Sequence, residues 1–497
     1  MRVARAIVPA FVVALLLISA AGDHYFRDEF YYLACTRRLA WGYVDHPPLS
    51  VAMLWAVRQV AGESLLVLRL VAALALAATV WLTGRIARRL GAGGFGEALA
   101  MVAIAVAPAF LATGTFYSMN VFDVLLWTAA LRLLIDLVDG APLGRWAVFG
   151  ALLGLGLLNK ISVLWLGAGI GVALLTTARP VLRTPGPYLA AAIAGVLFLP
   201  HLLWQVANAW PTLEFIEGAS RQKMLGKTPW AFMGEQVMNM HPMALAVWGV
   251  GLVGLLSAPR LRRYRALAVV YLTAAVILMA NSTSRSGYLL PAYPPLIAAG
   301  AVMWESWLRQ PAWRTAALVV LVLAGAATAP LAVPILPVDR YVRYSASLGI
   351  QPSTEEKKDV GRLPQFFADR QGWERFVGQV AAAWDRLTPE ERRSAAVLTG
   401  NYGEAGAIET LGASRGITAI SGHNSYWLWG PAGRTGDVLI VLSTRQERLE
   451  RLFASVELAG RTECGDCMPY ENGLGVYVCR GPRRPLSDVW PDLKHYD

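Results

Sequence analysis

The residues whose types could do chemistry gather first in the segment Asp23–Leu49, which reads DHYFRDEFYYLACTRRLAWGYVDHPPL. In it the adjacent carboxylates of Asp28 and Glu29 stand among tyrosine and phenylalanine side chains. Partial burial beside aromatic groups raises the pKa of a carboxylate and fits it for work as a general base or a metal ligand. We therefore predict that Asp28 and Glu29 are catalytic. The alternative is that both are solvated loop charges.

The same segment ends in Asp45-His46-Pro47-Pro48, which places a carboxylate and an imidazole on a rigid turn. Both side chains are competent ligands for Zn²⁺, and aspartate alone suits Mg²⁺ or Mn²⁺. The pair therefore predicts a divalent metal as a cofactor, with Asp45 and His46 as its ligands. In the alternative interpretations, His46 contacts a phosphate or caps the turn.

Three isolated ionisable residues follow in otherwise apolar surroundings: Asp123, Lys160 and Arg285. Ionisable groups at the edge of a membrane helix are functional candidates by default. Arginine suits bidentate binding of phosphate, and lysine can hold an anionic group. The alternatives are a helix N-terminal charge for Asp123 and a side chain that snorkels to the membrane surface for Lys160.

The composition of the chain indicates which elements must position these residues. The 497 residues are 56% hydrophobic and 16% charged, whereas soluble proteins carry about 25% charged residues. Backbone groups in hydrocarbon must be satisfied internally, so apolar runs of about 20 residues are expected to be membrane helices. We predict about eleven spans, near residues 6–22, 64–84, 95–113, 120–138, 145–159, 161–178, 187–204, 241–258, 266–282, 287–307 and 315–334.

The net charge of +11 lies mainly on arginines in alternate short loops. This positive-inside pattern places the N-terminus in the cytoplasm, and an odd number of spans leaves the C-terminal part outside. The charge therefore indicates a membrane surface rather than a nucleic acid as the partner. Alternatively, Ser19-Ala20-Ala21 marks the cleavage site of a signal peptide, which also leaves the following segment outside.

The chain divides into three parts by composition. Residues 1–336 form the transmembrane domain, whose outer loop 23–63 is predicted to carry two interfacial helices. Phe30, Leu33, Ala34 and Trp41 would face the membrane in the first, and Leu49–Val60 forms the second. Residues 337–362 are a polar, flexible linker. Residues 363–497 form a soluble α/β domain, with strands at Ala395–Leu398, Asp437–Leu442 and Gly475–Cys479 and helices at Trp373–Leu387 and Gln446–Ser455.

Three of the four cysteines, Cys464, Cys467 and Cys479, lie in the predicted outer domain. A Cys-x-x-Cys pair can bind zinc, but the sequence offers no convincing fourth ligand. In an oxidising compartment a disulfide is the favoured interpretation, with the pairing among the three left open.

Taken together, the ordered motifs of residues 1–335 resemble the C-type membrane glycosyltransferases. More narrowly, the chain resembles bacterial glycosyltransferase family 39, which includes relatives of protein O-mannosyltransferases and is akin to the lipid A aminoarabinose transferases. The residues that carry the resemblance are Asp28-Glu29-Phe30-Tyr31-Tyr32, Asp45-His46-Pro47-Pro48-Leu49, Tyr117-x5-Asp123, Gly154–Lys160 and Arg285-x2-Tyr288-Leu289-Leu290-Pro291.

The resemblance implies a polyprenyl-phosphate sugar donor, with Asp28 as the leading catalytic residue and Asp123 as a second cavity carboxylate. Lys160, Arg285, Tyr288 and His46 would bind the donor phosphate. Asp45-His46 stand where the aminoarabinose branch has Glu-Lys before Pro-Pro. Asn401–Gly406 and Ser421–Trp427 also resemble segments of bacterial members, where a lid or an acceptor platform is expected.

The sequence therefore predicts a polytopic α-helical membrane protein of the C-type glycosyltransferase fold with a C-terminal periplasmic α/β domain. It would sit in a bacterial inner membrane and move a hexose or pentose from the lipid donor to a lipid, glycan or protein acceptor. The absence of a glycine-rich nucleotide loop between a strand and a helix agrees with a lipid-linked donor. The alternatives are a flippase of lipid-linked saccharides, for which mid-membrane polar pairs and internal repeats are expected, and a non-catalytic scaffold.

Overall fold

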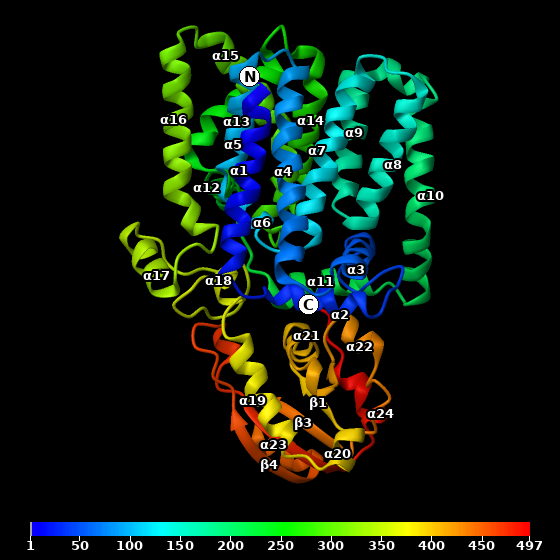
Figure 1. Ribbon diagram of the computed structural model, residues 1–497. Helices are drawn as coiled ribbons and strands as arrows, with labels where there is room; N and C mark the ends of the chain where they lie inside the picture. Colours follow the sequence, from blue (N-terminus) through cyan, green and yellow to red (C-terminus); the bar gives the residue numbers. More distant parts are fainter. Residues whose placement is uncertain (1) are drawn as a thin grey trace.

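The computed structural model describes residues 2–497 and shows a long helical bundle with a smaller α/β part at one end (Figure 1). Residue 1 of the predicted membrane domain lies outside the described residues. Every predicted span falls on one or two of the following bundle helices: α1 (Arg2–Ala21), α4 (Leu65–Arg89), α5 (Gly94–Ala105), α6 (Pro108–Gly114), α7 (Met119–Val138), α8 (Leu143–Asn159), α9 (Val163–Thr177), α10 (Gly186–Ala207), α13 (Pro242–Ser257), α14 (Arg265–Ala280), η4 (Ser286–Ala292), α15 (Tyr293–Trp307) and α16 (Pro311–Thr328).

Among the described residues, four helical segments are long and apolar enough to cross a membrane by themselves: Leu65–Arg89, Gly186–Ala207, Arg262–Ala280 and Pro311–Leu331. Two bent pairs raise this number to six if each pair is one span. α5 and α6 meet at 66°, and α12 (Pro229–Asn239) meets α13 at 110°. The predicted membrane-type helical fold is therefore present, while the number of eleven spans stays a prediction.

The first helix is an integral part of the bundle. α1 packs against α4 and buries Val12, Leu16 and Ala20. Near its end, Ser19 Oγ donates a hydrogen bond to the carbonyl oxygen of Pro334, at 3.2 Å. These contacts make α1 part of the bundle, and the alternative of a cleaved signal peptide stays open.

Several of the arginines that predicted the orientation meet at the end of the bundle that carries the N-terminus, away from the α/β part (Figure 1). Glu97 pairs with Arg5 and Arg88, and the carboxylates of Asp136 and Asp139 both pair with Arg89. Asp136 also pairs with Arg145, and Asp139 with Arg263. The loops between separate helices are thereby tied together on one face of the bundle.

The α/β part is built on a mixed five-stranded sheet with the order β2-β1-β3-β5-β4. β1 (Ala396–Thr399) is parallel to both β2 (Ala419–Ser421) and β3 (Val438–Ser443), while β5 (Gly475–Pro482) runs antiparallel to β3 and β4 (Phe453–Arg461). β1, β2 and most of β3 are buried, as expected for parallel strands covered on both faces. The helices of this part are α18 (Gln365–Ala368), α19 (Trp373–Asp385), α20 (Pro389–Ser394), α21 (Tyr402–Leu411), α22 (Ser425–Trp429), α23 (Gln446–Leu452) and α24 (Leu486–Val489).

The outer loop departs from its prediction. The first helix, α2, covers Arg27–Thr36 and ends before Trp41, and its residues Phe30, Leu33 and Ala34 are fully buried. α2 lies between the bundle and α21, as Figure 1 shows, so this face meets protein and not lipid. The prediction of an interfacial helix was wrong here because one apolar face fits a membrane and a second domain equally well. α3 (Leu49–Ala61) matches the second predicted helix.

The segment predicted as a flexible linker is also held in place. It contains helix α17 (Val338–Ser347), and beyond it Glu355 pairs with Lys227 at 2.7 Å. Glu356 pairs with Arg285 at 2.6 Å. Polar composition alone did not reveal these partners, which lie far away in the sequence.

A disulfide joins Cys464 to Cys467, while Cys35 and Cys479 are free and buried. Of the pairings left open by the sequence, the structure therefore shows the local one.

Candidate active site

Helix α2 positions the two acidic residues of its first turn differently. Negative side chains are favourable at a helix N-terminus, where the backbone N–H groups are unpaired. Asp28 is half-buried, and its Oδ1 accepts a hydrogen bond from the hydroxyl of Tyr402 at 2.9 Å. Among the described residues, Asp28 makes no other side-chain hydrogen bond. Its second oxygen is thus available to take a proton.

Glu29 is fully buried, and each of its two carboxylate oxygens already accepts two hydrogen bonds. Its two oxygens accept hydrogen bonds from Arg69 at 2.7 and 2.9 Å, and also from the backbone N–H groups of Tyr117 and Phe26 at 2.8 Å. A buried carboxylate in a bidentate arginine pair is a structural anchor. This geometry contradicts the prediction that Glu29 is a catalytic base, and the long-range partner Arg69 was not visible in the sequence.

The structure brings together Asp123, Lys160 and Tyr288, which are far apart in the sequence. Lys160 Nζ lies 3.5 Å from Asp123 Oδ2 and 4.8 Å from the centre of the Tyr288 ring. It also donates to Asn120 Oδ1 at 2.8 Å, and Ser162 Oγ donates to Asp123 Oδ1 at 2.6 Å. The end of α8 and the start of α7 and η4 converge here. The sequence analysis did not identify Ser162. Its position only two residues after Lys160 could have indicated it.

A hydrogen bond connects this cluster to α2. The backbone N–H of Met119, at the start of α7, donates to the hydroxyl of Tyr32 at 2.9 Å. Asn159 Nδ2 donates to the carbonyl oxygen of Met119 at 2.9 Å. The helix that carries Asp28 is therefore fixed beside the Asp123–Lys160 pair.

Arg285 faces the same region from the loop before η4. Its Nη2 donates to Glu356 Oε1 at 2.6 Å, and 38% of its side chain stays exposed. Burial opposes the charge, but Tyr288, Glu356, Glu355 and Asp28 together hold the pKa of Arg285 above its usual value. Arg285 is thus a cation that is paired with Glu356 and keeps an open face.

Asp45 and His46 are enclosed by tyrosine side chains. Asp45 Oδ1 accepts from the hydroxyl of Tyr31 at 2.9 Å, and burial raises its pKa. The His46 ring is 2% exposed and stacks on Tyr32; its Nε2 has no hydrogen-bond partner and lies 3.9 Å from Asp45 Oδ1.

Asp45 Oδ1 and His46 Nε2 offer two donor atoms, and Mg²⁺ is often held by one or two protein ligands together with substrate phosphates. Among the described residues, the group of three potential ligands is elsewhere, at His423, His495 and Asp497. Metal binding by Asp45 and His46 therefore stays a prediction. The enclosure of His46 by tyrosine rings opposes its predicted contact with a phosphate.

The segments Asn401–Gly406 and Ser421–Trp427 dock the α/β part onto α2. Asn401 caps α21, and added side chains at Gly403 and Gly406 would collide with Arg27 and with the backbone of Phe30. Ser425 Oγ lies 2.7 Å from the hydroxyl of Tyr31. The close approach of α21 is what brings Tyr402 to Asp28, a contact that sequence reasoning did not find.

The chain is similar in sequence to two groups of known proteins. A family described as dolichyl-phosphate-mannose-protein mannosyltransferase matches residues 45–204. The lipid A galacturonosyltransferase RgtD of Rhizobium johnstonii is 24% identical over 213 residues, which are 43% of this chain and 45% of the relative. The match thus spans less than half the length of that curated relative.

Solved structures show the fold. ArnT from Cupriavidus metallidurans bound to undecaprenyl phosphate matches with a TM-score of 0.63 and 14% identity, over 95% of this chain and 97% of that one. The arabinofuranosyltransferase AftD from Mycobacteria matches with a TM-score of 0.52 and 16% identity, over 97% of this chain and 40% of that one.

The chain is therefore a membrane-type helical protein related to the C-type glycosyltransferases. Within that class, its sequence is similar to the mannosyltransferase family model over residues 45–204 and to a lipid A galacturonosyltransferase over 213 residues. The predicted resemblance is confirmed.

Proposed function

We propose that the protein transfers a hexose or pentose from a polyprenyl-phosphate donor to a lipid, glycan or protein acceptor of the cell envelope. The observation that carries this proposal is that the hydrogen bond from Met119 to Tyr32 ties α2, the helix of Asp28, to the Asp123–Lys160 pair, while Tyr288 joins Lys160 to the loop of the second cation, Arg285. The resemblance in fold to a protein bound to undecaprenyl phosphate supports the same donor class.

In the proposed reaction, Asp28 accepts the proton of the acceptor's nucleophile as that nucleophile attacks the anomeric carbon. The bond from this carbon to the phosphate oxygen breaks, and its electron pair leaves with the polyprenyl phosphate. Lys160 and Arg285 stabilise the negative charge that develops on the phosphate, with Tyr288 beside Lys160. Asp123 positions Lys160 through their ion pair.

We also propose a bacterial inner-membrane location with the N-terminus in the cytoplasm and the α/β part in the periplasm. The arginine-rich end of the bundle supports this orientation through the positive-inside rule. The Cys464–Cys467 disulfide at the opposite end supports an oxidising compartment. The predicted dependence on a divalent metal stays a prediction, and loss of transfer in EDTA with recovery on adding Mg²⁺, Mn²⁺ or Zn²⁺ would bear it out.

A flippase is the second candidate because two helix pairs are bent, as discontinuous helices are in transporters. The two functions predict different products. A transferase changes the covalent structure of an envelope molecule, whereas a flippase changes only the leaflet in which a lipid-linked sugar resides.

The test is mass analysis of envelope glycans and lipid-linked sugars in a deletion strain. Complementation with the wild type should restore a sugar-modified acceptor, and Asp28→Asn should leave the acceptor unmodified while the lipid-linked sugar accumulates. Restored modification by Asp28→Asn would contradict the proposed chemistry. Transbilayer movement of the donor in vesicles without any new glycoside would favour the flippase.

A further inference from the structure

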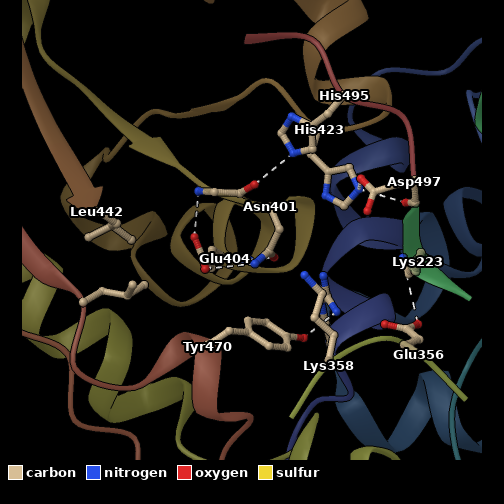
Figure 2. Close-up of a pocket in the computed structure, with 13 residues that line it drawn as sticks. Lys223, Glu356, Lys358, Asn401, Glu404, His423, Leu442, Tyr470, His495 and Asp497 are labelled. Atoms are coloured by element: carbon tan, nitrogen blue, oxygen red, sulfur yellow. Dashed lines mark hydrogen bonds and ion pairs between the residues drawn. The ribbon is translucent and has the colours of Figure 1, made fainter. Parts of the chain in front are cut away.

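A cavity of about 240 Å³ lies between the α/β part and the outer face of the bundle, beyond the carboxyl ends of β1, β2 and β3 (Figure 2). β1 pairs with β2 on one side and with β3 on the other. The connections that leave β1 and β2 therefore run to opposite sides of β1, which makes its carboxyl end a topological switch point. Crevices at such switch points are where open α/β sheets bind ligands. The volume equals that of several water molecules, at about 30 Å³ each.

Arg27, which lines this cavity, is a buried cation without a carboxylate partner. Its side chain is 6% exposed, and none of the described carboxylates forms an ion pair with it. Nη1 donates to the hydroxyl of Tyr470 at 2.8 Å, and the guanidinium lies over the rings of Tyr402 and Tyr470. Nε is buried and has no partner. Burying a charge without an oppositely charged partner costs free energy, unless a bound ligand supplies that partner.

Lys223 adds a second incompletely paired cation on the opposite wall. It is 9% exposed, and its Nζ lies 4.0 Å from Glu356 Oε1 without a hydrogen bond to any described residue. Glu356 is already bound by Arg285 at 2.6 Å. Lys358 lies at the rim, over the ring of Tyr470.

The remaining acids of the wall already have partners. Glu404 accepts from the backbone N–H of Gly400 and from Asn401 Nδ2, both at 2.9 Å. Asp497 Oδ1 lies 3.4 Å from His423 Nε2. Among the described carboxylates, Lys223 therefore has only the long 4.0 Å pair with Glu356, and Arg27 has no ion pair.

The same cavity holds His423, His495 and Asp497, whose donor atoms lie within 4.8 Å of one another. Arg27 and Lys223 oppose a divalent cation there, because both place a positive charge on the wall of the same cavity. The nitrogens of His495 face the carbonyl oxygens of Leu493 and Gly400, at 2.9 and 3.1 Å. The electrostatics of the cavity therefore favour an anion over a metal.

We propose that this cavity binds an oxyanion of the phosphate class, held by Arg27 through paired N–H groups and by Lys223 as a point charge. The phosphate can belong to a soluble molecule or to a lipid headgroup. The binding does not depend on the proposed transfer reaction, although Arg27 stands next to Asp28.

The test is calorimetric titration of the full chain, in neutral-lipid nanodiscs, with inorganic phosphate at constant ionic strength. The wild type should bind phosphate saturably. Arg27→Gln and Lys223→Gln should each weaken binding by about tenfold or more, the loss expected for one charge-assisted contact. Arg415→Gln, which removes an exposed arginine paired only with Asp385, is the matched control and should bind as the wild type does.

Equal affinity in the wild type and in both variants would overturn the proposal. If Arg27→Gln fails to fold because Arg27 packs against Gly403, Lys223→Gln still carries the test. Saturable Zn²⁺ binding that His495→Ala abolishes, without any phosphate binding, would instead establish a metal site.

A second titration in nanodiscs that contain phosphatidic acid identifies the source of the phosphate. Weaker apparent binding of inorganic phosphate there would show that a lipid headgroup competes for the cavity, and unchanged binding would assign it to soluble phosphates. Asp28→Asn should keep its phosphate affinity in either case, so failure of the transfer reaction can be told apart from failure of this site.

Discussion

At the scale of single residues, the site separates carboxylates that hold the fold from those that can react. Glu29 and Asp28 are neighbours, yet one is sealed by Arg69 and the other keeps an open oxygen. The sequence predicted both as catalytic because both are carboxylates and they are neighbours in the chain. The distinction rests on partners 40 and 374 residues away.

Lys160 and Asp123 depend on each other. Lys160→Met would leave the Asp123 carboxylate buried without its cation and should lower the free energy of unfolding by about 3 kcal/mol. Adding Asp123→Asn removes the stranded charge and should recover at least half of the loss without recovering transfer. Thermal unfolding in detergent measures both variants. A double variant that is no more stable than Lys160→Met would contradict the ion pair.

Three buried carboxyl groups make the α/β part sensitive to pH. Burial raises the pKa of Asp369 and of Glu404 to about 7, and that of Glu471 well above its usual value. Because the folded state keeps protons that the unfolded state releases near pH 4, stability should fall as pH rises from about 4 through 7.

Glu404→Gln should therefore remove one of the three contributions to this pH dependence and stabilise the protein at pH 8 by about 2 kcal/mol. Melting temperatures at pH 5 and pH 8 provide the measurement. Glu447→Gln, at an exposed position of α23, is the control and should leave the slope unchanged. An unchanged slope in Glu404→Gln would show that its carboxyl group is ionised throughout.

At the scale of elements, the helices of the bundle were predictable and the docking of α2 was not. A long apolar run is enough by itself to predict a membrane helix, without knowledge of distant contacts. Every predicted span accordingly lies on a helix. β4 was missed because eight of its nine residues are exposed or only partly buried, and β2 was missed because it has only three residues. The place of α2 depends on α21, which follows it by more than 360 residues.

The contact between α2 and α21 should control the α/β part. Gly406→Val would place a side chain about 2.8 Å from the backbone of Phe30, too close for a van der Waals contact. We expect faster proteolysis in segment 350–362 and loss of transfer, because Tyr402 no longer reaches Asp28. Limited trypsin digestion measures this, and Gly378→Val on α19, with open space around it, is the control. Equal digestion of both variants would contradict the docking.

At the scale of the whole molecule, the arginine-rich end and the α/β part define two opposite faces (Figure 1). The predicted orientation can be measured with single introduced cysteines, since Cys35 and Cys479 are buried and the other two cysteines form a disulfide. Ser487→Cys should react with an impermeant maleimide in spheroplasts. Arg179→Cys should react only after permeabilisation, and the reverse pattern would contradict the orientation.

The central claim is that Asp28 activates the acceptor for attack on a polyprenyl-phosphate sugar. Its most direct test is the release of polyprenyl phosphate from a labelled donor by the purified protein in the presence of an envelope acceptor extract. Asp28→Asn should lower the rate by about 10²–10⁴-fold, as expected for loss of a general base, with donor binding and melting temperature retained. Asp488→Asn, an exposed aspartate also in the first turn of a helix, should match the wild type. A wild-type rate in Asp28→Asn would contradict the account.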